Sequence, residues 1–293
     1  MPLHKFSEAE LRQFCKEAIE SLEFWLRRLI DITLEPIYGV NYINATVQGT
    51  NQNIIKKSIR ESVQSRAASN PKRYPRMVDA MLLDDEIDII CHPDLYKNNF
   101  AEYFKPSYPF GNDHLRLYLR KIIEPRNNLS HSNPISVYQA EQVICYTHDI
   151  IESIKYRLKE KNMDKEYNAP MLIKVVDSRG IVIHDSQISR NNTCLGHIDL
   201  ASNKSAWLRS GDTFSVEVEV DPSFSQDNYC IEWVLPKNVN AIKTESKITI
   251  MLNDQDVRVD FTIYCKVVSN ENWHRCGDVD DAVGITYKVL PPI

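Results

Sequence analysis

The sequence lacks several features that would assign a function class at once. Among its 293 residues there are only 8 glycines and 14 prolines, and 26% are charged, a composition that excludes fibrous repeats and extended disorder. No run of about 18 apolar residues occurs, so no membrane-spanning helix is predicted. A phosphate loop, a Gly-x-Ser-x-Gly elbow and a dinucleotide-binding fingerprint are also missing, which disfavours the enzyme classes that depend on them.

The 7 cysteines show no CxxC pair. Their scatter, their odd number and the lack of an apolar secretory segment predict reduced thiols in a cytoplasmic protein, without disulfides or structural zinc. Two segments, DDEID at 84–88 and WHRCGDVDD at 273–281, contain metal-ligating residue types but no second ligand pair at a suitable spacing. We therefore expect no metal and no cofactor, and interpret DDEID as a helix surface.

The first half of the chain has the three- and four-residue apolar spacing of amphipathic helices. One such stripe runs from Ser7 to about Leu34, and Ser7 with Glu10 forms a capping-box pattern at its start. Pro125 is expected to bend or break the helix that precedes it. The remaining helices are predicted at roughly 51–67, 76–90, 94–104, 113–123 and 137–158.

After the last helix the polar segment KEKNMDKEYNAP has the composition of a linker, and the apolar period changes from 3.6 to 2. About seven short strands follow, with Trp233 as a candidate central core residue. The sequence thus predicts an α+β multidomain chain. It comprises an all-α domain over 1–162, a linker over 163–170 and an all-β, immunoglobulin-like sandwich over 171–293.

An arginine five residues before a histidine occurs twice, in PRNNLSH and in RGIVIH, whereas about 0.4 such pairs are expected by chance. The second pair, Arg179 and His184, runs from a turn into a strand, where residues five apart face opposite sides; we regard it as accidental. The first pair, Arg126 and His131, lies at a corner between two helices. On an ideal helix five residues span about 500°, so these side chains diverge by about 140°. Only a distorted helix end, the length of Arg126 or a second subunit would bring such groups together.

The context of the first pair resembles a known family. The stretch LRKIIEPRNNLSHSNPISVYQAEQVICYTHDIIESI is similar to the signature of the HEPN superfamily, all-α domains marked by Arg-Asn-x-x-x-His at a helix end, followed by a polar turn and a long apolar helix. Arg126, Asn127 and His131 match the motif, and Leu129 matches its apolar position. The similarity extends over roughly residues 5–160.

This resemblance implies metal-independent cleavage of RNA by a homodimer, in which two motifs form one composite site. His131 would transfer protons and Arg126 would hold the scissile phosphate, chemistry that suits imidazole and guanidinium. Asn127 would support them. The expected products are a 2′,3′-cyclic phosphate and a 5′-hydroxyl, and family members suggest a toxin or effector in bacterial antiphage defence.

Other interpretations stay open. The helical domain could be a catalytically silent HEPN dimer that serves as an RNA-binding or protein-interaction module, with Arg126 and the neighbouring asparagines merely capping a helix end. The C-terminal domain could bind a protein or a small ligand, or restrain the nuclease.

A basic segment in this acidic chain, whose net charge is −5, could form an RNA-binding rim or simply a solvated helix face. Its members are Lys56, Lys57, Arg60, Arg66, Lys72, Arg73 and Arg76.

Overall fold

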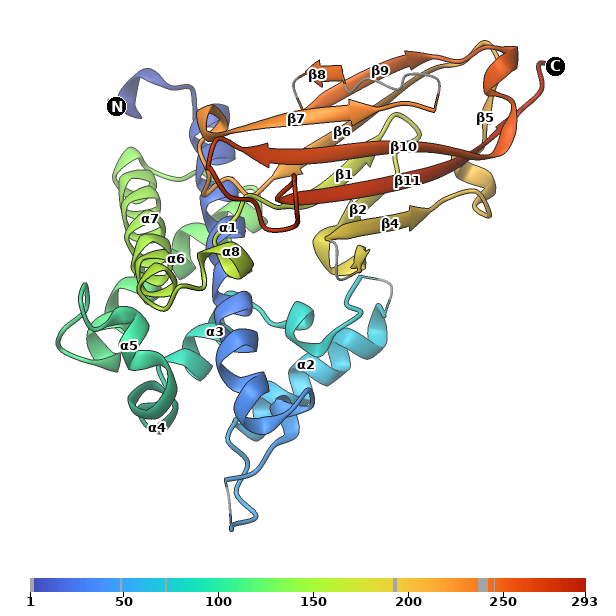
Figure 1. The fold of residues 1–293 in the computed structure, drawn as a ribbon. Coiled ribbons are helices and arrows are strands. Elements are labelled where there is room, and N and C mark those ends of the chain that lie inside the picture. Colours follow the sequence, from blue (N-terminus) through green and yellow to red (C-terminus); the bar gives the residue numbers. More distant parts are fainter. Residues whose placement is uncertain (1–2, 48, 72, 192–193, 237–241, 245) are drawn as a thin grey trace. The chain divides into compact units, whose positions relative to one another are not determined.

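The chain forms two compact units, Met1–Met163 and Asp164–Ile293, in a computed structural model (Figure 1). The first unit is helical and the second is built from strands, so the fold is α+β with the helices first. None of the helices in the described part of the chain is long and apolar enough to cross a membrane. The structure describes residues 3–47, 49–71, 73–191, 194–236, 242–244 and 246–293.

The helical unit is organised around α1 (Glu8–Tyr38), which packs along α6 (Asn112–Ser130) and α7 (Val137–Glu160) (Figure 1). The predicted capping box is confirmed: Ser7 Oγ accepts from the Glu10 N–H at 3.3 Å, and Glu10 Oε2 accepts from the Ser7 N–H at 2.8 Å. The apolar stripe of α1 is buried, including the fully buried Trp25. The other helical elements are η1 (Leu3–Lys5), η2 (Tyr42–Asn44), α2 (Lys57–Ser69), η3 (Met77–Ala80), α3 (Leu83–Ile90), α4 (Pro93–Leu95), the π-turn η4 (Tyr96–Phe100) and α5 (Ala101–Phe104).

Helix α6 does not break at Pro125, where the sequence predicted that the helix would bend or break. The helix runs on to Ser130 with Pro125 buried inside it, and His131 is the C-cap. The N–H that a proline lacks would have bonded to the carbonyl of Lys121, an exposed residue where water can take its place. Arg126 therefore lies within a continuous helix. Helix α2 also differs from prediction, since it begins at Lys57 and not near 51.

The second unit contains two sheets, with strand orders β2-β1-β6-β9 and β3-β4-β11-β10-β7-β8, and β5 also pairs with β11. The long strands predicted from the alternating segments are confirmed. The sequence predicted about seven strands, and the additional ones are among the short strands β2, β3, β4, β5 and β8. The strands are β1 (Leu172–Asp177), β2 (Val182–His184), β3 (Ser189–Arg190), β4 (Leu195–Asp199), β5 (Leu208–Arg209), β6 (Thr213–Val220), β7 (Tyr229–Val234), β8 (Ile242–Thr244), β9 (Lys247–Met251), β10 (Arg258–Ser269) and β11 (Asp281–Leu290). The predicted linker includes the short helix α8 (Asp164–Tyr167).

One apolar core lies between the two sheets. Phe214 of β6 and Tyr287 of β11 make an edge-to-face contact across it, with ring centroids 4.8 Å apart. Trp233 is fully buried in the same core, as the sequence indicated. Burial of aromatic rings of this size contributes the largest single apolar terms to such a core.

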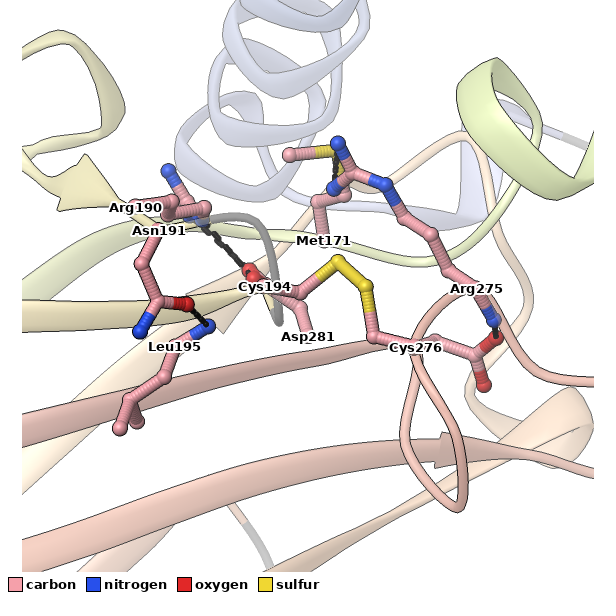
Figure 2. Close-up of a disulfide and its surroundings, with 9 residues drawn as sticks. Met171, Arg190, Asn191, Cys194, Leu195, Arg275, Cys276 and Asp281 are labelled. Carbon is pink, nitrogen blue, oxygen red and sulfur yellow. Dashed lines mark hydrogen bonds and ion pairs between the residues drawn. A yellow bond between two sulfur atoms is a disulfide. The ribbon is translucent and has the colours of Figure 1, made fainter.

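A disulfide joins Cys194 to Cys276, contrary to the expectation that all thiols are reduced (Figure 2). Cys194 directly precedes β4, and Cys276 lies in the connection between β10 and β11, with 5.9 Å between the Cα atoms. Because the two cysteines are 82 residues apart in sequence, no local pattern indicated that they pair. Since disulfides persist mainly in oxidising compartments, the bond removes the thiol argument for a cytoplasmic location, which stays a prediction.

A buried ion pair reinforces the same end of the sheet. The guanidinium of Arg190 donates to both carboxylate oxygens of Asp281, at 2.8 and 2.9 Å (Figure 2). It also donates to the carbonyl of Leu172 at 2.8 Å. The Asp281 side chain is completely buried, and the same carboxylate accepts the Leu172 N–H at 2.9 Å. The start of β11 is thus tied to β1 and β3 by charge-assisted hydrogen bonds.

Removing the disulfide is expected to destabilise the strand unit. Because the bond closes a long loop, Cys194→Ser should lower the free energy of unfolding by about 2–4 kcal/mol, measured by denaturant titration without reductant. Dithiothreitol should lower the wild type to the same value and leave the variant unchanged. Alkylation of denatured protein should modify 5 thiols before reduction and 7 after it; modification of all seven without reductant would contradict the bond.

Candidate functional site

The Arg-Asn-x-x-x-His motif occupies the C-terminal end of α6. The Arg126 side chain is 20% exposed and points toward α1, where its Nε lies 3.5 Å from Glu23 Oε1. Its Nη1 donates to Asn127 Oδ1 at 3.2 Å. His131 is exposed, and its backbone N–H donates to the Asn127 carbonyl at 3.0 Å. One motif residue is therefore held against the neighbouring helix, and the other is free at the surface.

Arg126 is the outer end of a chain of alternating charges that leads into the helical unit. Glu23 also accepts from Arg27 Nη2 at 2.8 Å, and Arg27 Nε donates to Glu86 Oε1 at 2.9 Å. The Glu86 side chain is completely buried, and burial raises its pKa well above the ordinary 4.5, with Arg27 opposing the shift. This chain fixes Glu23, and through Glu23 it restrains Arg126.

The turn that carries His131 is also held by α1. The guanidinium of Arg12 donates to the carbonyl of Asn133, two residues after the histidine, and the Asn133 N–H donates to the Asn128 carbonyl at 2.8 Å. Arg12 and Glu23 are eleven residues apart, which corresponds to a rotation of about 20° after three turns. A single face of α1 therefore supports both ends of the motif.

An open groove lies beside the motif, between the first turns of α1 and the end of α6. Leu129 lies inside the motif and Ser132 follows His131 directly, so the groove adjoins the histidine on both sides in sequence. Arg12 and Lys16 supply two positive charges and Glu8 one negative charge. The groove is lined by Glu8, Ala9, Arg12, Gln13, Lys16, Leu129 and Ser132.

Several positive charges of the basic segment are paired with acidic side chains, so fewer of them are available to bind RNA than the composition suggests. Lys56 pairs with Asp88 at 3.2 Å, Arg66 with Asp85, and Arg76 with Asp31 and Asp79 at 3.0 and 2.7 Å. Three further members have local partners. Lys57 pairs with Glu61 at 3.6 Å, Arg60 donates to the Ile55 carbonyl at 3.2 Å, and the guanidinium of Arg73 lies 5.2 Å from the centre of the Tyr74 ring. Lys72 lies outside the described residues. RNA binding by this segment stays a prediction.

The sequence predicted that the acidic DDEID segment is a helix surface, but part of it is buried. Glu86 is completely buried and faces Arg27, while Asp85 and Asp88 accept from the basic segment. The two charged segments are thus partly each other's partners. Within the described residues, no three His, Cys, Asp or Glu side chains converge on a point that could hold a metal ion.

The residues of the second candidate metal segment have other roles. Cys276 forms the disulfide, and His274 Nδ1 lies 3.1 Å from Asp280 Oδ2. The buried Asp280 also accepts the backbone N–H groups of Ser269 and Arg275, at 2.7 and 3.1 Å. This carboxylate therefore organises the β10–β11 connection.

Sequence reasoning missed the contribution of α1. Arg12, Lys16 and Glu23 interrupt a helix whose opposite face is strongly apolar, and their four- and seven-residue spacing places them on one stripe. That stripe is a signal for a polar contact with a second element. The partner helix cannot be read from it, because α6 lies about a hundred residues further along the chain.

Comparison with known proteins provides no family for this chain: no protein-family model, no curated protein and no solved structure matches it. The strongest geometric fact is the joint placement of Arg126 and His131 at one helix end, with α1 supporting both.

Proposed function

We propose that the helical unit is a HEPN-type, metal-independent endoribonuclease that acts as a homodimer. The observation that carries the proposal is the end of α6, where Arg126 is held at 3.5 Å from Glu23 and His131 is exposed. A guanidinium held by a second helix is preorganised to bind a phosphate, and an exposed imidazole can reach a substrate. On an ideal helix the two side chains would diverge by about 140°, so we assign the other half of the site to a second copy.

The chemistry requires two proton transfers at one phosphate. His131 of one copy removes the proton of the ribose 2′-hydroxyl, and the 2′-oxygen bonds to phosphorus as the bond to the 5′-oxygen breaks. His131 of the second copy gives a proton to the 5′-oxygen. The products are a 2′,3′-cyclic phosphate and a 5′-hydroxyl, and Arg126 stabilises the charge that develops on the phosphate oxygens.

The alternative is a catalytically silent module that binds RNA or protein, and one observation favours it. Arg126 already has an acidic partner in Glu23 and an amide partner in Asn127, which is what a purely structural arginine requires. In that case the 3.5 Å ion pair stabilises the packing of α6 on α1, and His131 has no role in cleavage.

For the strand unit we propose an immunoglobulin-like sandwich that binds a protein or small ligand. Its two sheets share one core, which supports a rigid platform for loops at its ends. The proposed setting is a toxin or effector in bacterial antiphage defence. That setting follows from the family resemblance alone.

Cleavage of labelled RNA in the presence of EDTA tests the proposed activity. Wild type should release fragments with cyclic phosphate ends, and Arg126→Ala should lower the rate by about 10²–10³-fold, as for loss of a donor that stabilises transition-state charge. Arg179→Ala is the matched control, because it alters the arginine of the dismissed RGIVIH match and should leave the rate unchanged. A folded dimer without cleavage, or an unaffected Arg126→Ala variant, would favour the silent module.

A further inference from the structure

We propose that the groove between the start of α1 and the end of α6 binds the sugar–phosphate backbone of single-stranded RNA beside the scissile phosphate. This inference rests on the proposed ribonuclease function and assigns the substrate path on each protomer. Its residues are those that line the groove, chiefly Lys16, Arg12 and Leu129.

The groove lies next to His131 along the chain. Leu129 and Ser132 bracket His131 in sequence, and both line the groove. A strand whose scissile phosphate meets His131 therefore has its neighbouring nucleotides within reach of this surface. The groove is open to solvent, so a polymer can lie in it without threading.

The groove lining contains more positive than negative side chains. Arg12 and Lys16 outnumber Glu8 in the groove lining, although the whole chain has a net charge of −5. Lys16 is 61% exposed, and its pair with Glu20 is 3.8 Å long. Exposed pairs of this kind contribute little and are easily exchanged for a phosphate. The lining thus offers a phosphate two cationic partners, Arg12 and Lys16, and phosphate binding to them would release counterions.

The remaining lining fits a nucleotide. Leu129 presents an apolar side chain against which a ribose or base can pack. The Gln13 amide nitrogen donates to Glu17 at 2.5 Å, and its amide oxygen can accept a hydrogen bond from a ribose hydroxyl. Arg12 is held by its hydrogen bond to the Asn133 carbonyl. That bond joins the groove to the turn bearing His131, so RNA contacts at Arg12 act directly on the turn.

Binding to a cleavage-deficient protein tests the groove. In a His131→Ala background, a fluorescent single-stranded RNA of about 12 nucleotides should bind, and adding Lys16→Glu should weaken binding by about 5–20-fold at moderate salt. The slope of log K against log salt should fall by about 0.7, the value for one phosphate contact on a single strand. Lys105→Glu, an equal charge reversal at an exposed lysine outside the groove, is the control and should have a much smaller effect.

A second variant gives the opposite sign. Glu8→Gln removes the acidic group from the groove lining and should strengthen RNA binding by about 2–3-fold. Equal affinities for Lys16→Glu and Lys105→Glu would overturn the groove while leaving cleavage by the wild type intact. Conversely, Lys16-dependent binding by a protein that cleaves no RNA would support the groove and refute the nuclease. Absence of RNA binding by the folded dimer would refute both.

Discussion

Replacing His131 by alanine is expected to lower the rate of RNA cleavage by about 10²–10⁴-fold. A positioned general acid or base contributes a factor of this size, equivalent to about 3–5 kcal/mol of transition-state stabilisation. In a homodimer the substitution removes both the base and the acid, so the loss should lie toward the upper end. Initial rates on a labelled RNA, in EDTA, give the measurement.

The chain provides its own control for that experiment. His184 lies five residues after Arg179, as His131 does after Arg126, and is exposed on β2. His184→Ala should leave the rate within about twofold of wild type. Because His131 is exposed, its removal should not alter the thermal midpoint. A His131→Ala variant that is folded, dimeric and fully active would refute its catalytic role.

Replacing Arg27 by methionine is expected to destabilise the helical unit by about 3–5 kcal/mol, because the substitution leaves the completely buried Glu86 without its ionic partner. Oε2 of Glu86 has no hydrogen-bond partner among the described residues, so Oε1 and Arg27 carry its stabilisation. The double variant Arg27→Met/Glu86→Met removes both charges and should recover most of the loss. Denaturant midpoints of the two variants measure the difference.

The same variants should respond differently to pH. The pKa of Glu86 is higher in the folded protein than its ordinary 4.5, so the folded state binds more protons and its stability decreases as pH rises above that value. Arg27→Met removes the charge that opposes the shift, so its instability should be larger at pH 8 than at pH 5. The double variant should not show this slope. An Arg27→Met protein as stable as wild type at pH 8 would contradict the buried pair.

Local patterns predicted the elements whose signals are local. The start of α1 follows from the capping box of Ser7 and Glu10, and the long strands follow from alternation in segments such as VEVEV. Helix α6 was predicted too short, because a proline inside a helix disfavours but does not forbid its continuation, and here the lost hydrogen bond falls at the exposed Lys121. The disulfide depends on two cysteines meeting where the neighbouring strands β4 and β11 begin, which spacing along the chain does not encode.

The candidate site was predicted only in part. The motif and its place at a helix end pointed to Arg126 and His131, and the rotation of an ideal helix predicted that their side chains diverge. The contacts that support them, from Glu23 and Arg12 of α1, depend on how α1 and α6 pack. Likewise, the basic segment and DDEID were interpreted separately, although Arg66 and Asp85 are partners. Long-range pairing of charges is a tertiary property that composition cannot reveal.

The place of β11 in its sheet means that this sheet can be completed only late in synthesis of the chain. β11 pairs with β4 and β10 on either side, so the sheet stays incomplete until Asp281–Leu290 has left the ribosome. The whole helical unit, Met1–Met163, emerges earlier, by an interval on the order of ten seconds at ordinary synthesis rates. A ribonuclease restrained only by its own strand unit would be unrestrained for that interval. The composite site that we propose would avoid this hazard, since a single nascent copy would hold only half of the catalytic groups.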